Sequence, residues 1–445
     1  MLHYFIDARS WDEYYPEKGS ENPFPPHIAW GSRPKSLPRG GPWQYVETDW
    51  HAFDVTDDEF GGDSKVADWV AAQLARKREK PFFLACGIYR PHEPWFVPKR
   101  YFDLFPLEQV SLPPGYREGD LDDLPGSGKR AGPNRYFAHI RRHGQWKQAV
   151  QAYLASIAYA DAMLGRVLGA LDNSPHRDNT IVVLWSDHGW HLGEKQHWQK
   201  FTIWRAATRV PLIIRVPRET PGLSSGTAPG TRCSAPVNLL SLFPTLTELC
   251  GLPRKEDNSG PSLLPLLQDA GAEWPHVSLT WGHQPGTVGL STAGWRYLRY
   301  ADGGEELYNI RNDPYEWHNL AARAEHAERL ATLRAKAPRK FAPFAEPRLA
   351  SLPQLAWKGG AAPASMPDGN PFHVTFVNRR TEAVELFWMD RQGSPRPYGL
   401  IAPGASKAQQ TRPGAVWQIT VPGQGQPLGH FTVGDRAARA VVPRD

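Results

Sequence analysis

The chain has 445 residues, which is too long for one ordinary domain and suits two or three. Hydrophobic residues make up 40% and charged residues 22%, so the chain can bury a sizeable core, and a disordered polypeptide is excluded. The net charge is +5, and the basic residues are scattered along the sequence. This distribution argues against nucleic acid as a binding partner and favours an anionic small molecule or glycan as the substrate. Ordinary lysine and arginine residues on the surface explain the charge equally well.

The first part of the chain predicts loops, then a helix and a strand. Residues 1–62 are rich in proline, glycine and aromatic residues and show little periodicity, so we expect mostly loop. From Asp63 the apolar residues recur at helical spacing to about residue 80. The apolar run Pro81 to Ile88 is too short for a helix and predicts a buried strand, which would bury the thiol of Cys86. A helix followed by a buried strand is typical of a mainly parallel sheet.

The middle of the chain repeats this rhythm. Residues 102–145 contain several proline and glycine breakers and are expected to be loop. A long amphipathic helix is predicted over 148–172. The sequence contains no run of 18 apolar residues, so the pattern predicts no membrane-spanning helix. Two further buried strands are predicted at 180–185 and 211–216, and two helices at 238–250 and 321–337. Three short antiparallel strands are predicted at 277–282, 295–301 and 305–310. A bridge between Cys233 and Cys250 is geometrically conceivable and has no motif to support it.

The last hundred residues differ in composition. Residues 350–370 have the composition of a linker. After them come short strand patterns divided by Gly/Pro turns and without a helix signal, at 373–378, 384–390, 415–421 and 430–434. This tail predicts an all-β sandwich.

Two polar segments follow predicted strands. Asp187 and His188 come directly after the strand at 180–185, where open α/β sheets place ligand-binding groups, and a carboxylate beside an imidazole can bind a divalent cation. The chain after this pair can fold back so that the ammonium group of Lys200 faces a negatively charged oxygen of the substrate. The alternative is that Asp187 only caps a turn and the histidine decorates a loop.

The second segment, YRPHEPW, follows the predicted strand 81–88. Two prolines flank His92, so its imidazole is presented rigidly, as a group donating to an anionic oxygen requires. The alternative is a structural histidine in a proline-rich turn.

Three long segments together resemble the sulfatase family, most closely iduronate-2-sulfatase and its bacterial relatives. They are PFFLACGIYRPHEPWFVPKRYFDLFP, YLASIAYADAMLGRVLGALD and IVVLWSDHGWHLGEKQHWQKFTIWRAATRVPLIIRVP, and the likeness runs from about Trp11 to Ala345. The resemblance implies an α/β fold: an alkaline-phosphatase-like α/β/α sandwich, amino-terminally truncated, with a small antiparallel α+β subdomain ahead of the all-β sandwich. It also implies a Ca²⁺ ion and hydrolysis of a sulfate ester, with a sulfated glycan or another small sulfate ester as substrate.

The resemblance assigns roles to five residues. Asp187 and His188 would be calcium ligands, His92 would contact the sulfate or leaving-group oxygen, and Lys200 would be a second positive clamp on the sulfate. His3 would assist near the nucleophile if MLHYF continues the family's Gly-Lys-x-Phe-His turn. A cation with lysine and histidine donors stabilises the charge that develops in sulfate ester cleavage.

The family's nucleophile motif is absent from the sequence. That nucleophile is a formylglycine made from the first residue of Cys/Ser-x-Pro/Ala-x-Arg. Cys86 and Arg90 have the spacing, but Ile88 replaces Pro/Ala, and the family's early Asp-Asp pair is also missing. We therefore expect a sulfuric ester hydrolase that is inactive as it stands, with apolar sheet edges exposed, and the hypothesis is that the first methionine is internal to a longer gene or that the gene is truncated.

The tail resembles the β domain of the von Hippel-Lindau protein, where an aromatic pocket can recognise a hydroxyproline peptide. Trp388, Tyr398 and Trp417 stand at matching positions, but Ala415 replaces the histidine that would read the hydroxyl and Thr411 replaces the neighbouring serine. Two alternatives stay open for the tail: it binds a peptide or a glycan, or its tryptophan side chains only pack in the core of the sandwich.

These patterns predict a domain order and two functions. The domains are an incomplete catalytic core at 1–275, a subdomain at 276–349, the linker at 350–370 and the β domain at 371–445. The alternative to a hydrolase is a non-catalytic binding protein that uses the residual anionic pocket or the β domain; a phosphatase or phosphodiesterase fits the pattern less well. Family members are usually exported, but the first residues carry no signal-peptide pattern, so the location stays open.

Overall fold

The computed structural model divides the chain into two compact units, Met1–Phe341 and Ala342–Asp445. It describes residues 10–16, 35–41, 44, 47–220, 222–223, 226–343, 349–357, 359–360, 362–367 and 371–444. His3 lies outside the described residues.

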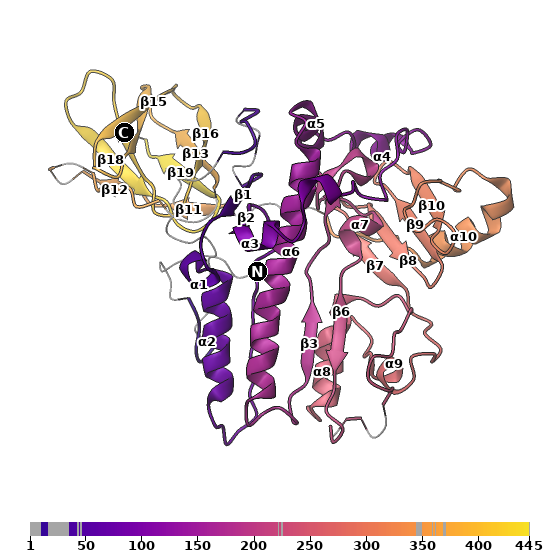
Figure 1. Ribbon diagram of the computed structural model, residues 1–445. Coiled ribbons are helices and arrows are strands. Elements are labelled where there is room, and N and C mark those ends of the chain that lie inside the picture. Colours follow the sequence, from indigo (N-terminus) through magenta and orange to yellow (C-terminus); the bar gives the residue numbers. More distant parts are fainter. Residues whose placement is uncertain are drawn as a thin grey trace. The chain divides into compact units, whose positions relative to one another are not determined.

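The first unit combines helices with several small sheets (Figure 1). Its helices are α1 (Asp57–Phe60), α2 (Asp63–Ala75), α3 (Lys99–Phe102), α4 (Gly126–Arg130), α5 (Arg135–Arg142), α6 (Trp146–Asp172), α7 (Arg205–Thr208), α8 (Leu242–Leu249), α9 (Leu264–Gln268) and α10 (Ala327–Lys336), with 3-10 turns η2 (Leu107–Gln109), η3 (Glu194–Gln196), η4 (Leu239–Ser241) and η5 (Ala324–His326). Its strands are β1 (Trp50–Phe53), β2 (Trp95–Pro98), β3 (Val182–Trp185), β4 (His191–Leu192), β5 (Trp198–Gln199), β6 (Leu212–Arg215), β7 (Ser278–Trp281), β8 (Val288–Ser291), β9 (Trp295–Arg299) and β10 (Glu305–Asn309).

The helix predicted at 148–172 is α6, and it packs beside α2 and against β2 (Figure 1). Its alanines allow a close approach, and Ala155, Tyr159 and Met163 are fully buried in one core cluster. By length and composition α6 would also be long and apolar enough to cross a membrane, a possibility that the sequence pattern did not indicate. Ala155, Tyr159 and Met163 of this helix belong to the core of the unit.

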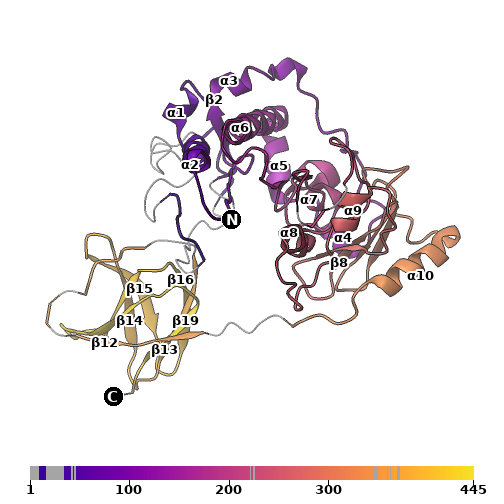
Figure 2. The ribbon, with the colours of Figure 1, turned by 90° about the horizontal axis from the view of Figure 1, so that it is seen from below.

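The central strands pair differently from the mainly parallel sheet that was predicted. β1 and β2 are parallel, whereas β3 pairs antiparallel with β6. The strands β10, β9, β8 and β7 form an antiparallel sheet. Leu330 and Leu333 of α10 pack against it, and Figure 2 shows α10 in the same part of the unit as β8. The sequence pattern found β7, β9 and β10 and missed β8.

The run Pro81 to Ile88 is not a strand, and that prediction was wrong. Phe82 and Leu84 pack toward α2 and α6, but Phe83 on the other face is 75% exposed and Cys86 is an exposed free thiol. A strand needs a hydrogen-bonded neighbour, and no described residue pairs with this run. Cys233 and Cys250 are free as well, so no bridge joins them.

Apolar side chains are also exposed at the neighbouring pair of strands. Trp185 on β3 is 48% exposed and Ile213 on β6 is 60% exposed. These two strands were predicted to be buried, and that part of the prediction was wrong.

Three loop predictions were incomplete. The region 102–145 contains α4 and α5, whose apolar residues Phe137 and Ile140 are fully buried. Residues 1–62 contain β1 and α1. The stretch 350–370, expected as a linker, contains two short strands that pair with the β sandwich described next.

The second unit is the predicted β sandwich. Its strands are β11 (Ala350–Leu352), β12 (Leu355–Ala356), β13 (Phe372–Asn378), β14 (Val384–Met389), β15 (Pro395–Ile401), β16 (Ser406–Thr411), β17 (Val416–Thr420), β18 (Pro427–Thr432) and β19 (Ala438–Val442). They form two sheets, ordered β11-β19-β13-β16 and β12-β18-β17-β14-β15. Alternate side chains of the two sheets, with Phe376, Trp417 and Phe431 among them, form one core.

Candidate functional site

Four of the five predicted site residues meet in the first unit. Asp187 and His188 follow the end of β3, Lys200 follows β5, and His92 lies in the turn that leads into β2. The Nζ atom of Lys200 is 3.1 Å from Nε2 of His92 and 2.9 Å from Nε2 of His188. Oδ2 of Asp187 is 3.8 Å from Nε2 of His188. Segments far apart in the chain therefore converge on one ammonium group.

The hydrogen bonds of the two imidazoles define their tautomers. Nδ1 of His92 lies 2.7 Å from the Glu93 carbonyl and Nδ1 of His188 lies 2.8 Å from the Gly189 carbonyl. A carbonyl can only accept, so each Nδ1 carries the proton and each Nε2 presents a lone pair. The Lys200 ammonium donates to both Nε2 atoms, and one of its three N–H groups stays available for an anion.

Burial keeps both imidazoles neutral. Desolvation, with the positive charge of Lys200 and the neighbouring His188, lowers the pKa of His92 to about 4. Burial also lowers the pKa of His188. Trp190 packs against both rings, with ring centroids 5.7 Å from His92 and 6.3 Å from His188. The two imidazoles thus share an aromatic neighbour, and the hydrogen-bond donor between them is a cation.

A pH dependence of stability follows for His92. Its pKa is lower in the folded chain than the value of about 6.5 in an unfolded one, so between these values the unfolded state binds more protons. The stability contribution is present above pH 6.5 and is lost as the pH falls toward 4, by about 3 kcal/mol. In urea unfolding, His92→Gln should remove this part of the acid slope, while the exposed control His276→Gln keeps it. An unchanged slope in His92→Gln would contradict the assignment.

The turn that carries His92 is fixed by a residue whose only sequence signal was its place at the start of a predicted helix. The buried carboxylate of Asp63, at the start of α2, accepts the backbone N–H groups of Tyr89 at 2.8 Å and Arg90 at 3.1 Å. The guanidinium of Arg90 donates to the Phe96 carbonyl on β2. The turn is thus bound to a helix and to a strand at once, which restricts the position of the imidazole.

Glu93 and Gln199 link the two halves of the site. The amide of Gln199 donates to Oε1 of Glu93 at 2.8 Å. Burial raises the pKa of Glu93 to about 8, so its carboxyl group is protonated in part at neutral pH. This contact joins the His92 turn to the residue before Lys200. The sequence offered only one signal for it, the adjacency of these residues to His92 and Lys200.

The loop before Lys200 is held by a buried ion pair. The ammonium of Lys195 is 2% exposed, lies 2.9 Å from Oδ1 of Asp120 and donates to the carbonyl of Glu316. Lys195, Gln196 and Gln199 have φ values of 54°, 48° and 81°, in the left-handed region. Non-glycine residues adopt this conformation only where surrounding contacts enforce it.

The described residues do not fit a calcium ion. Ca²⁺ takes six to eight oxygen ligands, whereas this site offers one half-exposed carboxylate, Asp187, and an imidazole whose Nε2 already faces the Lys200 ammonium. In the described part of the chain no group of three or more His, Cys, Asp or Glu side chains is arranged to hold a metal. The adjacent aspartates Asp57 and Asp58 do not supply the missing ligands, because the Asp57 carboxylate accepts hydrogen bonds from the guanidinium groups of Arg100 and Arg166. The predicted Ca²⁺ therefore has no ligand set here.

Two family models match the chain. The sulfatase model matches residues 2–252, and the VHL beta domain model matches residues 364–428. The first match includes all five predicted site residues and the second covers most of the β sandwich.

The curated relatives are sulfatases. A protein named sulfatase from Formosa agariphila is 36% identical over 346 residues, which are 76% of this chain and 66% of the relative. Human iduronate 2-sulfatase is 34% identical over 221 residues, which are 41% of this chain and 38% of the relative. The chain thus spans just under two thirds of the first relative and well under half of the second.

Solved structures share the fold of the first unit. A phosphonate monoester hydrolase of Agrobacterium radiobacter aligns with a TM-score of 0.55 at 22% identity, covering 70% of this chain and 66% of the other. A protein solved in complex with D-glucosamine-2-N,6-O-disulfate aligns with a TM-score of 0.51 at 23% identity, covering 62% and 69%. The predicted fold class, an alkaline-phosphatase-like α/β core followed by a sheet-rich domain, is confirmed.

Proposed function

The chain belongs to the sulfatase family, and we propose that it carries the sulfate-binding half of a sulfuric ester hydrolase site. The observation that supports this most directly is the Lys200 ammonium, which donates to two neutral imidazoles and keeps one N–H for an anionic oxygen. Charge-assisted hydrogen bonds of this kind are the strong ones, and the aromatic surroundings strengthen them further.

Each residue then has a role in binding the ester. Lys200 donates to a non-bridging sulfate oxygen, and His92 and His188 orient the ammonium by accepting from it. The negative charge of a bound sulfate raises the pKa of both imidazoles and opposes the effect of burial. His92 can then take up a proton at Nε2 from solvent, which ends its hydrogen bond from Lys200, and donate that proton to the leaving-group oxygen. His3, which lies outside the described residues, keeps its proposed place near the nucleophile.

Turnover needs groups that this sequence does not contain. No Cys/Ser-x-Pro/Ala-x-Arg motif occurs in the 445 residues, and the described carboxylates make no metal site. We therefore propose that the chain as given binds sulfate esters without hydrolysing them and becomes a hydrolase only with a nucleophile and metal ligands from elsewhere. Asp187 would add a carboxylate oxygen to such a metal site, and His188 would add Nε2 only if that atom were released from the Lys200 ammonium.

A sulfated sugar is the substrate class we propose. The human relative is named for iduronate sulfate, and the net charge of +5 of this chain suits an anionic glycan. The position of the sulfate on the sugar is left to experiment. A ligand of the β domain, a peptide or a glycan, has less support because Trp417 is only 2% exposed.

Sulfate binding by the purified chain tests the proposal. In calorimetric titrations with phenyl sulfate, Lys200→Met should weaken binding at least tenfold, because the central cation is lost. The matched control Lys336→Met removes an exposed lysine on α10 and should bind as the unaltered chain does. Equal affinities of Lys200→Met and the unaltered chain would overturn the assignment.

Turnover separates the hydrolase from a binding protein. Release of 4-nitrophenol from 4-nitrophenyl sulfate should be undetectable with the chain alone. Turnover that is lost in Lys200→Met would show that the nucleophile lies within these 445 residues. Faster hydrolysis of 4-nitrophenyl phosphate than of the sulfate would favour a phosphatase.

A further inference from the structure

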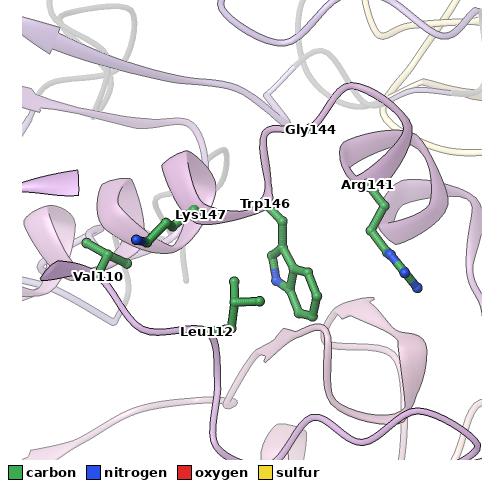
Figure 3. Close-up of a pocket in the computed structure, with 6 residues that line it drawn as sticks. All are labelled: Val110, Leu112, Arg141, Gly144, Trp146 and Lys147. Carbon is green, nitrogen blue, oxygen red and sulfur yellow. The ribbon is translucent and has the colours of Figure 1, made fainter. Parts of the chain in front are cut away.

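A second hollow in the first unit lies at the junction of α5 and α6. It has a volume of about 530 Å³ and is lined by Val110, Leu112, Arg141, Gly144, Trp146 and Lys147 (Figure 3). This volume is in the range of small-ligand sites. None of the lining residues belongs to the site around Lys200.

Its apolar wall is rigid. The indole Nε1 of Trp146 donates to the Leu192 carbonyl at 2.6 Å, and its ring packs edge-on against Tyr116 and Phe137 with centroids 4.7 and 4.9 Å away. Leu112, which is 42% exposed, faces the indole across the hollow (Figure 3). A fixed aromatic ring loses little conformational entropy when a ligand covers it.

Two cations flank this wall. Arg141 lies on one side of Trp146 and Lys147 on the other (Figure 3). The Lys147 ammonium donates to the backbone carbonyl of Glu108. The Arg141 guanidinium donates to the Tyr116 hydroxyl at 3.3 Å and approaches the exposed carboxylate of Glu118 only to 4.0 Å. An exposed pair at that distance contributes little, so the guanidinium can change partner at small cost.

The charge around the hollow is more concentrated than the scattered pattern described for the whole sequence. From residue 124 to residue 160 there is no aspartate or glutamate. The same stretch contains Lys129, Arg130, Arg135, Arg141, Arg142 and Lys147. Of these cations, Arg141 and Lys147 line the hollow, and Arg142 follows Arg141 in the chain, so two positive charges at the hollow attract anions.

We propose that this hollow binds an anionic sugar residue of a glycan. The apolar face of a pyranose ring packs on Trp146 and Leu112, while sulfate or carboxylate substituents at its two ends pair with Arg141 and Lys147. The planar guanidinium suits a sulfate or carboxylate because it can donate two parallel hydrogen bonds. A neutral sugar would contact only the apolar side chains of Trp146 and Leu112. A small anion without a sugar ring would pair with only one of the two cations. The inference rests on the proposed function for its ligand class.

The hollow shares a support with the first site. Leu192, which accepts from Trp146, is in β4, and the same hairpin leads through β5 to Lys200. A glycan held at both places would present one sulfate to Lys200 while a second anionic sugar fixes the direction of the chain. Two linked contacts bind more tightly than either alone.

Titration with a fully sulfated heparin tetrasaccharide tests the proposal. The double variant Arg141→Ala/Lys147→Ala should bind it at least tenfold more weakly than the unaltered chain. The matched control Arg339→Ala/Lys340→Ala removes the same charge from an exposed segment of the same unit and should change the affinity less than twofold. Equal losses in both variants would show general electrostatic attraction and overturn the inference.

Phenyl sulfate separates this inference from the proposed function. It should bind equally well to the unaltered chain and to Arg141→Ala/Lys147→Ala, since it engages only Lys200. If Lys200→Met loses phenyl sulfate while Arg141→Ala/Lys147→Ala keeps full tetrasaccharide affinity, the hollow is not a glycan site and the proposed function stands. If Lys200→Met keeps phenyl sulfate while the double variant loses the tetrasaccharide, the hollow is a site in its own right.

Discussion

Lys195→Met is expected to lower the free energy of unfolding of the first unit by roughly 3–5 kcal/mol, because the variant leaves a buried carboxylate without its partner. Lys195 and Asp120 are 2% and 1% exposed, and their side chains are 2.9 Å apart. The desolvation of Asp120 is already large, since burial raises its pKa to about 6 even with the ammonium beside it. Urea unfolding measures the loss.

Two further variants make this test specific. Lys99→Met breaks an exposed ion pair with Asp103 and should cost at most about 1 kcal/mol. The double variant Lys195→Met/Asp120→Leu removes both charges and should recover part of the stability, since an apolar pair of similar volume can replace a buried ion pair. A single-variant loss below about 1 kcal/mol would mean that water reaches Asp120 once the lysine is gone.

The same variant should weaken sulfate binding although Lys195 does not touch the proposed anion position. Lys195 is the first of three left-handed residues in this loop, and the last of them, Gln199, directly precedes Lys200. Without the ion pair, this strained backbone has less to hold it. Lys195→Met should therefore raise the dissociation constant for phenyl sulfate in the fraction of protein that remains folded. Lys195 is thus a positioning residue.

The sequence predicted much of the fold where the pattern is local. The helix α6 follows from apolar periodicity, because its residues need only their neighbours in the chain to show which side is buried. The strands β3 and β6 follow from their apolar runs, but the prediction that they are buried was wrong, since Trp185 and Ile213 are exposed. Pro81 to Ile88 failed for the opposite reason. Its composition suits a strand, but a strand forms only when a neighbouring strand accepts and donates its backbone hydrogen bonds. The sequence of the run does not show whether such a neighbour is present.

The candidate site shows the same division. His92, His188 and Lys200 could be predicted because they stand in long recognisable segments, and the structure brings them together. His188 also follows the end of β3 and Lys200 follows β5, whereas the strand that was expected before His92 is absent. Their supports could not be predicted. The contact of Asp63 with Tyr89 joins residues 26 positions apart, and the buried Lys195 contradicts the usual exposure of lysine. Such contacts depend on tertiary packing that no local spacing records.

The aromatic residues of the β sandwich lead to the second large effect. Trp417→Ala is expected to lower the free energy of unfolding of the second unit by about 3–5 kcal/mol, because it opens a cavity in the core. Trp417 is 2% exposed, its ring lies 5.5 Å from Phe376 and 4.8 Å from Tyr398, and its Nε1 donates to Oγ1 of Thr411 at 3.0 Å. These contacts favour the core alternative over a peptide pocket.

Calorimetry of the full chain measures this effect, since the two compact units can unfold in separate transitions. Trp417→Ala should move only the transition of the second unit, and Leu400→Ala, which truncates a side chain that is 60% exposed, should move it by no more than about 0.5 kcal/mol. A ligand cannot reach Trp417 without opening the core. If Trp417→Ala left the unfolding transition in place, the ring would contribute little to the core, and a ligand-binding role would become the better explanation of this tryptophan.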